Sequence, residues 1–223
     1  MAHVEQTVAP SEFMNALLTL RSSNVRPEIA LEEIPAPRGI APYSVALEGQ
    51  LADSALTLAA ANLPRNPTIG DHDDVVTGKF ILLYDPAGQE SWGGNFRVVV
   101  LVRATIDQDI AGDPLLTEVA WSWLHEAFDF CGVAHDRLAG TITRTISETL
   151  GDVSPVEQVA EIEIRASWTP EVADPSHGIN LDFGPHLSAW TNLMSAAIGL
   201  PVVGQGFPAR HGLRGPQSII HGT

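Results

Sequence analysis

The stretch KFILLYDPAGQESWGGNFRVVVLVRATI, from Lys79 to Ile106, decides the fold. It holds two apolar runs, Lys79–Tyr84 and Phe96–Ile106, joined by a segment rich in turn-forming residues. Because this connection is too short for a crossover helix, the two runs are predicted to pair as antiparallel neighbours. The second run is apolar on both faces at its centre, which is typical of a strand in the middle of a sheet.

Alternation along this second strand predicts which of its side chains share a face. One face should hold Phe96, Val98, Val100 and Val102, and the other Arg97, Val99, Leu101 and Arg103. We expect the valine face to carry a helix predicted over Asp113–Cys131. The arginine face should be partly open, and it is where a ligand or partner is expected to bind.

The rest of the chain predicts an α+β fold: a mainly antiparallel sheet of four to five strands with helices mainly on one face. Further helices are predicted over Ser11–Arg21, with Ser11 as its N-cap, and over Pro185–Ile198, and further strands from Tyr43, over Thr141–Leu150 and over Val159–Trp168. Residues 24–42 hold four prolines and are predicted to form an extended arm. Residues 1–200 are expected to be a single domain, and residues 201–223 a disordered tail.

Charge and composition exclude several classes of protein. The 223 residues carry a net charge of −15, which disfavours binding to nucleic acid or to an anionic membrane. The sequence shows no apolar run of membrane-spanning length and no export signal, so a cytoplasmic protein is expected. One cysteine, Cys131, excludes an internal disulfide framework.

The segment DPAGQE, Asp85–Glu90, is similar to the switch loop of small GTPases, but its context is different. Those proteins need a phosphate loop that ends in Gly-Lys-Ser or Gly-Lys-Thr. The Gly78-Lys79 pair is followed by Phe80, and Lys79 is the only lysine, so the guanine-binding motif is absent too. The sequence therefore predicts no GTP binding, and no cofactor is expected.

Two small groups of residues have the side chains of metal or acid–base chemistry. His177, Asp182 and His186 suit zinc or iron, but they lack the fixed spacing of a metal-binding helix, and no metal is predicted. Glu118 and His125 are two turns apart on the predicted helix Asp113–Cys131 and suit acid–base catalysis if that side lines a cleft. In the alternative interpretation, Glu118 and His125 are only the polar stripe of a helix whose other residues, such as Trp123, are buried.

The residues predicted to bind a ligand or partner are Gln89, Trp92, Arg97, Arg103, Arg165 and Trp168. Trp92 either folds back onto the core or serves as an exposed aromatic anchor. The arginines lie within predicted strands, where they either form cross-strand ion pairs or capture a carboxylate or phosphate.

Several long segments resemble an actinobacterial family of uncharacterised proteins. They are RPEIALEEIPAPRGIAPYSVAL, LLYDPAGQESWGGNFRVV, DPLLTEVAWSWLHEA, GTITR and EIRASWTP, in that order along the chain. The resemblance covers residues 11–208. It implies an actinobacterial origin and a cytosolic setting, and it implies no activity or catalytic residues.

Two functions remain open from the sequence. The favoured one is a non-catalytic binding or regulatory protein acting through the sheet face and the Trp92 loop, with a protein or a small anionic ligand as partner. The alternative is a small enzyme that acts on an anionic metabolite held by arginine. The enzyme would be favoured if one pocket brought together Glu118, His125, Arg97 and Arg103. The sequence does not decide whether the protein is a homodimer.

Overall fold

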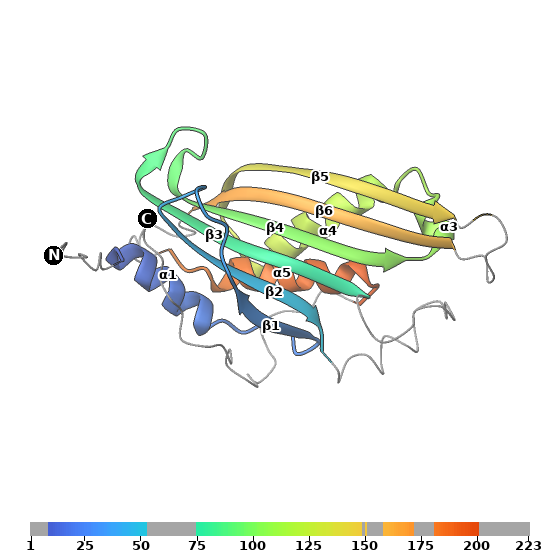
Figure 1. The fold of residues 1–223 in the computed structure, drawn as a ribbon, viewed down its shortest axis with the longest axis horizontal. Coiled ribbons are helices and arrows are strands. Elements are labelled where there is room, and N and C mark those ends of the chain that lie inside the picture. Colours follow the sequence, from blue (N-terminus) through green and yellow to red (C-terminus); the bar gives the residue numbers. More distant parts are fainter. Residues whose placement is uncertain (1–8, 53–74, 149, 151–157, 172–180, 201–223) are drawn as a thin grey trace.

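The computed structural model describes residues 9–52, 75–148, 150, 158–171 and 181–200. Their elements are α1 (Ser11–Arg21), β1 (Ile29–Ile34), β2 (Tyr43–Leu51), β3 (Val76–Gln89), β4 (Gly94–Ile106), α3 (Gln108–Ala111), α4 (Leu116–Cys131), β5 (His135–Glu148), β6 (Gln158–Pro170) and α5 (Gly184–Ala197). The strands form one antiparallel sheet in the order β1-β2-β3-β4-β6-β5 (Figure 1). The predicted α+β class is confirmed, with six strands in place of four to five. The tail 201–223 and His177 lie outside the described residues.

The hairpin that the sequence predicts is present as β3 and β4. Their ladder pairs Lys79 with Leu101 and Tyr84 with Phe96, and it continues past a register shift to Gln89. The turn is therefore shorter than the sequence indicates, because much of the connecting segment belongs to the strands. It closes at Gly93, whose φ of 70° suits a residue without a Cβ.

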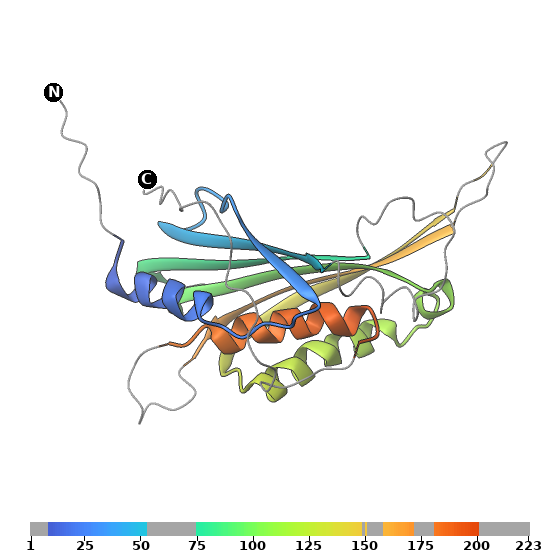
Figure 2. The same cartoon turned by 90° about the horizontal axis from the view of Figure 1, so that it is seen from below.

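The proline-rich arm, residues 24–42, contains a strand that the sequence does not predict, β1. Among the described strands β1 pairs with β2 alone, so it lies at the edge of the sheet, where neighbouring prolines are tolerated. Beyond β1 the chain rises on the side of the sheet away from α4 and α5 (Figure 2). There the Pro37 carbonyl accepts from Ser44 Oγ at 3.4 Å and the Ile40 carbonyl from Gln89 Nε2 at 3.5 Å. The arm is thus a strand followed by a loop, and the loop contacts one end of the sheet on the side away from α4 and α5.

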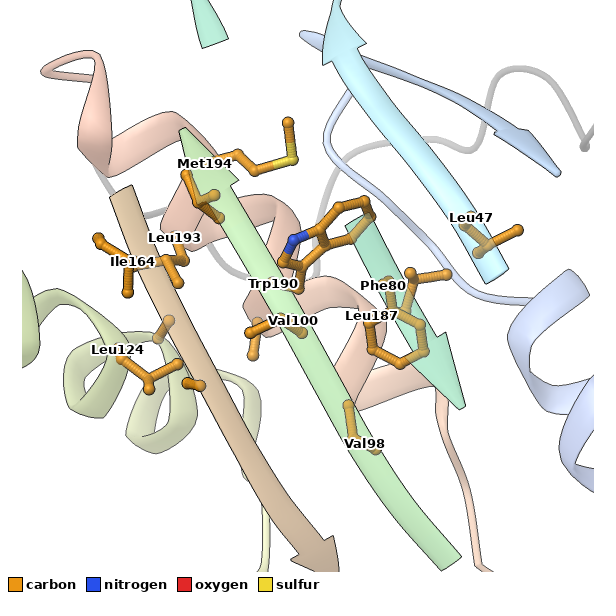
Figure 3. Packing of buried hydrophobic residues seen from close by; sticks show 14 of the residues in the cluster. Leu47, Phe80, Val98, Val100, Leu124, Ile164, Leu187, Trp190, Leu193 and Met194 are labelled. Carbon is orange, nitrogen blue, oxygen red and sulfur yellow. The ribbon is translucent and has the colours of Figure 1, made fainter. Parts of the chain in front are cut away.

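The two long helices, α4 and α5, lie side by side on one face of the sheet (Figure 2). α4 lies on the valine face of the sheet, as predicted, but α5 rather than α4 packs against β3 and β4 (Figure 3). α4 lies beyond it under β6 and β5, where the rings of Phe128 and Trp168 are 4.8 Å apart. Apolar valines require a helix above them, but they do not specify which one.

The contact of α5 with the sheet depends on two glycines in register, Gly49 and Gly78. A Cβ on Gly49 would lie 2.8 Å from the ring of Trp190, and one on Gly78 would lie 3.0 Å from it and from Met194 Sδ. The Trp190 indole fills the space that the missing side chains leave, and its Nε1 donates to the Leu101 carbonyl at 3.3 Å. These glycines are needed for the close approach of helix and sheet.

The boundary and phase of α4 differ from the prediction. The helix begins at Leu116, and Asp113 Oδ1 accepts from the Leu115 amide just before it. Its buried residues are Leu116, Ala120, Leu124, Ala127 and Phe128. Val119 and Phe130 are exposed and Trp123 is half-buried, so α4 buries a single face and is not buried everywhere outside a polar stripe. α1 also begins without a side-chain cap from Ser11, because Pro10 occupies the N-cap position.

None of the helices in the described ranges is both long enough and apolar enough to cross a membrane.

Candidate functional site

The face of the sheet opposite α4 and α5, here called the open face, carries the predicted arginines. Strand register places Arg103 directly opposite Glu163, and Leu101 opposite Arg165, with Arg97 further along β4 on the same side. Alternate residues of β4, such as Val98 and Val100, are buried on the other side. The partly open arginine face expected from the alternation is present.

Arg103 and Arg165 share one carboxylate, that of Glu163. Glu163 Oε2 lies 2.7 Å from Arg103 Nη2, and its Oε1 lies 2.8 Å from Arg165 Nε. Burial alone would raise the pKa of Glu163, whose side chain is 14% exposed, but hydrogen bonds from both arginines outweigh this and lower it. These two arginines therefore have a counter-ion, as the ion-pair interpretation of the sequence requires.

Arg97 has a different environment. Its Nη2 donates to Ser167 Oγ at 2.8 Å and to the Ser167 carbonyl at 3.2 Å, and its Nη1 donates to Thr169 Oγ1 at 3.1 Å. All three acceptors are neutral, and within the described ranges no carboxylate forms an ion pair with this half-buried guanidinium. Burial and the charge of Arg137 lower the pKa of Arg97, and Asp136 offsets this in part.

Arg137, which is not among the residues predicted from the sequence to bind a ligand, is the second cation of this site. It lies in the irregular part of the β5–β6 ladder and has a φ of 50°, uncommon for a residue with a side chain. Its Nη1 donates to the Glu90 carbonyl at 3.0 Å, and its Nε lies 3.7 Å from Asp136 Oδ2. A Cβ on Gly93 would overlap this guanidinium, so glycine is needed there for Arg137 to lie against the turn.

The β3–β4 turn is folded back onto the sheet. The Trp92 carbonyl accepts from Thr169 Oγ1 at 2.5 Å, and the Trp92 side chain is only 8% exposed. Gln89 Nε2 donates to Asp85 Oδ2 at 3.2 Å and is thus engaged within the hairpin. Trp168 is fully buried beneath the sheet, so it and Trp92 do not form an exposed aromatic patch.

His186, considered above as a metal ligand, has a structural role. It is 2% exposed, and its Nδ1 accepts from Trp168 Nε1 at 2.9 Å. Burial and the nearby His135 lower the pKa of His186 to about 3, so the ring is neutral. Asp182 accepts from the Gly184 amide at 2.8 Å, and the described residues contain no cluster of metal-ligating side chains.

The structure does not bring the candidate acid–base pair to the arginines. Glu118 and His125 are exposed on α4, whereas Arg97 and Arg103 lie on the open face, on the far side of the sheet. The His125 ring packs edge-on against Trp121, with centroids 5.7 Å apart. The single pocket that would have favoured an enzyme is not formed by these four residues.

Comparison with known proteins places the chain in a family. Residues 9–205 match the family DUF3000, described as proteins of unknown function. No curated protein and no solved structure matches the chain. Because the match covers most of the sequence, the chain belongs to the DUF3000 family of proteins of unknown function.

Proposed function

We propose that the protein is a non-catalytic cytoplasmic binding protein that takes a small anionic ligand at Arg97 and Arg137 on the open face. The ligand would present a carboxylate or a phosphate group. The observation that carries this proposal is the half-buried Arg97 guanidinium, whose described partners are all neutral and whose neighbour Arg137 is another cation.

The electrostatics of the two arginines favour an anion between them. Burial of a charged group costs free energy unless an opposite charge compensates it, and like charges add to that cost. Both effects lower the pKa of Arg97. A bound anion would offset the repulsion from Arg137 and add to the counter-charge that Asp136 supplies only in part.

The donors at this site match the oxygens of a carboxylate or phosphate. A guanidinium has five N–H donors in a planar fork, which suits bidentate contact with either group. The three described bonds of Arg97 leave donors for a ligand, and the Ser167 hydroxyl can rotate to donate as well. Thr169 holds Trp92 over the end of the sheet and so fixes the turn beside the site.

The proposal predicts that Arg97→Gln weakens anion binding about ten- to a hundredfold, the usual worth of one or two charge-assisted hydrogen bonds. Isothermal titration with inorganic phosphate and with succinate would measure it. Arg97→Lys should fall between wild type and Arg97→Gln, because lysine keeps the charge but lacks the fork.

Arg144→Gln is the matched control, because Arg144 donates to the Ala111 and Asp113 carbonyls and lies away from Arg97. It should bind anions as the wild type does. Binding that is undetectable for both probes in the wild type, or unchanged in Arg97→Gln, would contradict the proposed function. Thermal unfolding of each variant without ligand separates a loss of binding from a loss of folding.

A further inference from the structure

The two edges of the sheet are built differently. β1 is short, carries Glu32 and Glu33, and is followed at once by Pro35, which are the features that keep a sheet edge from pairing with other chains. β5 runs from His135 to Glu148 and is mostly exposed. From Thr141 to Ser147 it has no proline and no glycine, and five of these seven residues are threonine or isoleucine, which favour strands.

The one charge within Thr141–Ser147 does not protect this edge. Arg144 lies on the helix side, since it pairs with the buried Ile162 of β6. Its Nη1 donates to the Ala111 carbonyl at 3.2 Å and to the Asp113 carbonyl at 2.7 Å. The guanidinium is thus drawn toward α3 and the start of α4, and the backbone of the strand remains uncovered by it.

Exposed apolar side chains accompany the same edge. Ile146 is 52% exposed on the helix side of β5, and Ile110, Leu115 and Val119 are exposed on α3 and at the start of α4. Figure 1 shows α3 beside the end of β5. α4 is held beneath β5 by the Trp121 ring, which lies against Gly140 so closely that no Cβ would fit there. An unprotected strand bordered by apolar side chains is a surface suited to association.

We propose that two copies of the chain associate through β5, pairing antiparallel about a two-fold axis at Thr143. The sheet would continue from one copy into the other, and Leu138–Glu148 alone would give a paired edge of about 35 Å. With the apolar side chains beneath it, such an edge suits the roughly 800 Å² per partner of a standard interface. The proposal is independent of the anion site at Arg97.

The sequence of β5 is complementary to itself in this register, which is why a second copy is the occupant. Thr143 meets its own copy and Thr141 meets Thr145 on the open face, pairs that stabilise neighbouring strands. On the helix side Arg144 meets Ile142. A shift that centres the axis on Arg144 would instead place two guanidinium groups opposite each other, which is destabilising.

Thr143→Lys tests the pairing while it preserves the monomer. Within one chain Thr143 pairs with Glu163, so a lysine there faces a carboxylate. In the dimer two lysines would face each other across the axis. The matched control is Ala30→Lys, which adds the same charge at the exposed β1 edge, opposite Gln50.

Sedimentation velocity over a wide range of protein concentration gives the outcome. We expect a dimer for the wild type and for Ala30→Lys, and a monomer for Thr143→Lys with an unchanged circular dichroism spectrum. A wild type that stays monomeric at every concentration would overturn the proposal, as would a dimer that Thr143→Lys leaves intact.

Cysteine cross-linking checks the register even if the lysine variant fails to fold. In a Cys131→Ala background, Thr143→Cys should form a disulfide-linked dimer on mild oxidation, because the two side chains meet at the axis. Ser147→Cys, which would face Ala139 of the second copy, should not. Equal cross-linking of both variants, or of neither, would rule out pairing centred on Thr143.

Discussion

Trp190→Ala should lower the free energy of unfolding by about 3–5 kcal/mol, the usual loss when a buried aromatic side chain is removed from a core. The Trp190 side chain has no exposed area, and its ring centroid lies 5.7 Å from that of Phe80. The sheet beneath it carries Gly49 and Gly78, which have no side chains that could fill the space. The cavity would therefore stay open, and the loss should be near the upper end of this range.

Trp123→Ala is the matched control, since it removes the same side chain from a half-buried position on α4. It should cost clearly less than Trp190→Ala. Urea denaturation followed by circular dichroism measures both changes through the unfolding midpoint. Equal losses at the two positions would show that α5 does not hold the core as described.

The stability of the wild type should fall by about 2 kcal/mol as the pH decreases from 6.5 to 5. His186 is neutral in the folded protein because burial and His135 lower its pKa from 6.5 to about 3. In the unfolded chain the same ring takes up a proton below pH 6.5. Protonation therefore favours the unfolded state progressively from pH 6.5 down to about 3. The lowered carboxyl pKa values of Glu28 and Glu163 act only below 4.5, outside this window.

His186→Asn separates this effect from other titrations. The asparagine Oδ1 can accept from Trp168 Nε1 in place of the imidazole Nδ1, but it does not take up a proton in this range. Urea denaturation measures the free energy of unfolding at pH 6.5 and at pH 5. Between these two pH values the variant should lose about 2 kcal/mol less of it than the wild type. An identical pH dependence in both proteins would show that His186 is not buried in the neutral form.

Much of the architecture follows from local patterns in the sequence. The apolar runs on both sides of DPAGQE predict the β3–β4 hairpin, and the alternation from Val159 to Trp168 predicts β6 with one buried face. The prolines of residues 24–42 argue correctly against a central strand, but they do not exclude β1 at an edge. Which helix covers β4 depends on the packing of Trp190 against Gly49 and Gly78, and these residues are far apart in the chain.

The candidate site was predictable only in part. Alternation along β4 places Arg97 on the open face, yet its partners Ser167 and Thr169 follow from the β4–β6 register, which a single sequence does not reveal. The sequence does not single out Arg137, because it predicts a strand that begins at Thr141, beyond the irregular start of β5. The one sequence feature that could point to Arg137 is its position just before a predicted strand, in a chain with few cations.

The most direct test of the anion site is a titration of the wild-type protein with inorganic phosphate, followed by NMR of the arginine Nε–Hε groups. We predict saturable shifts of the Arg97 and Arg137 resonances, with those of Arg144 and of the ion-paired Arg165 unmoved. Shifts that are equal at all four arginines, or that do not saturate, would show only general ionic effects. They would contradict the assignment of Arg97 and Arg137 as the binding site.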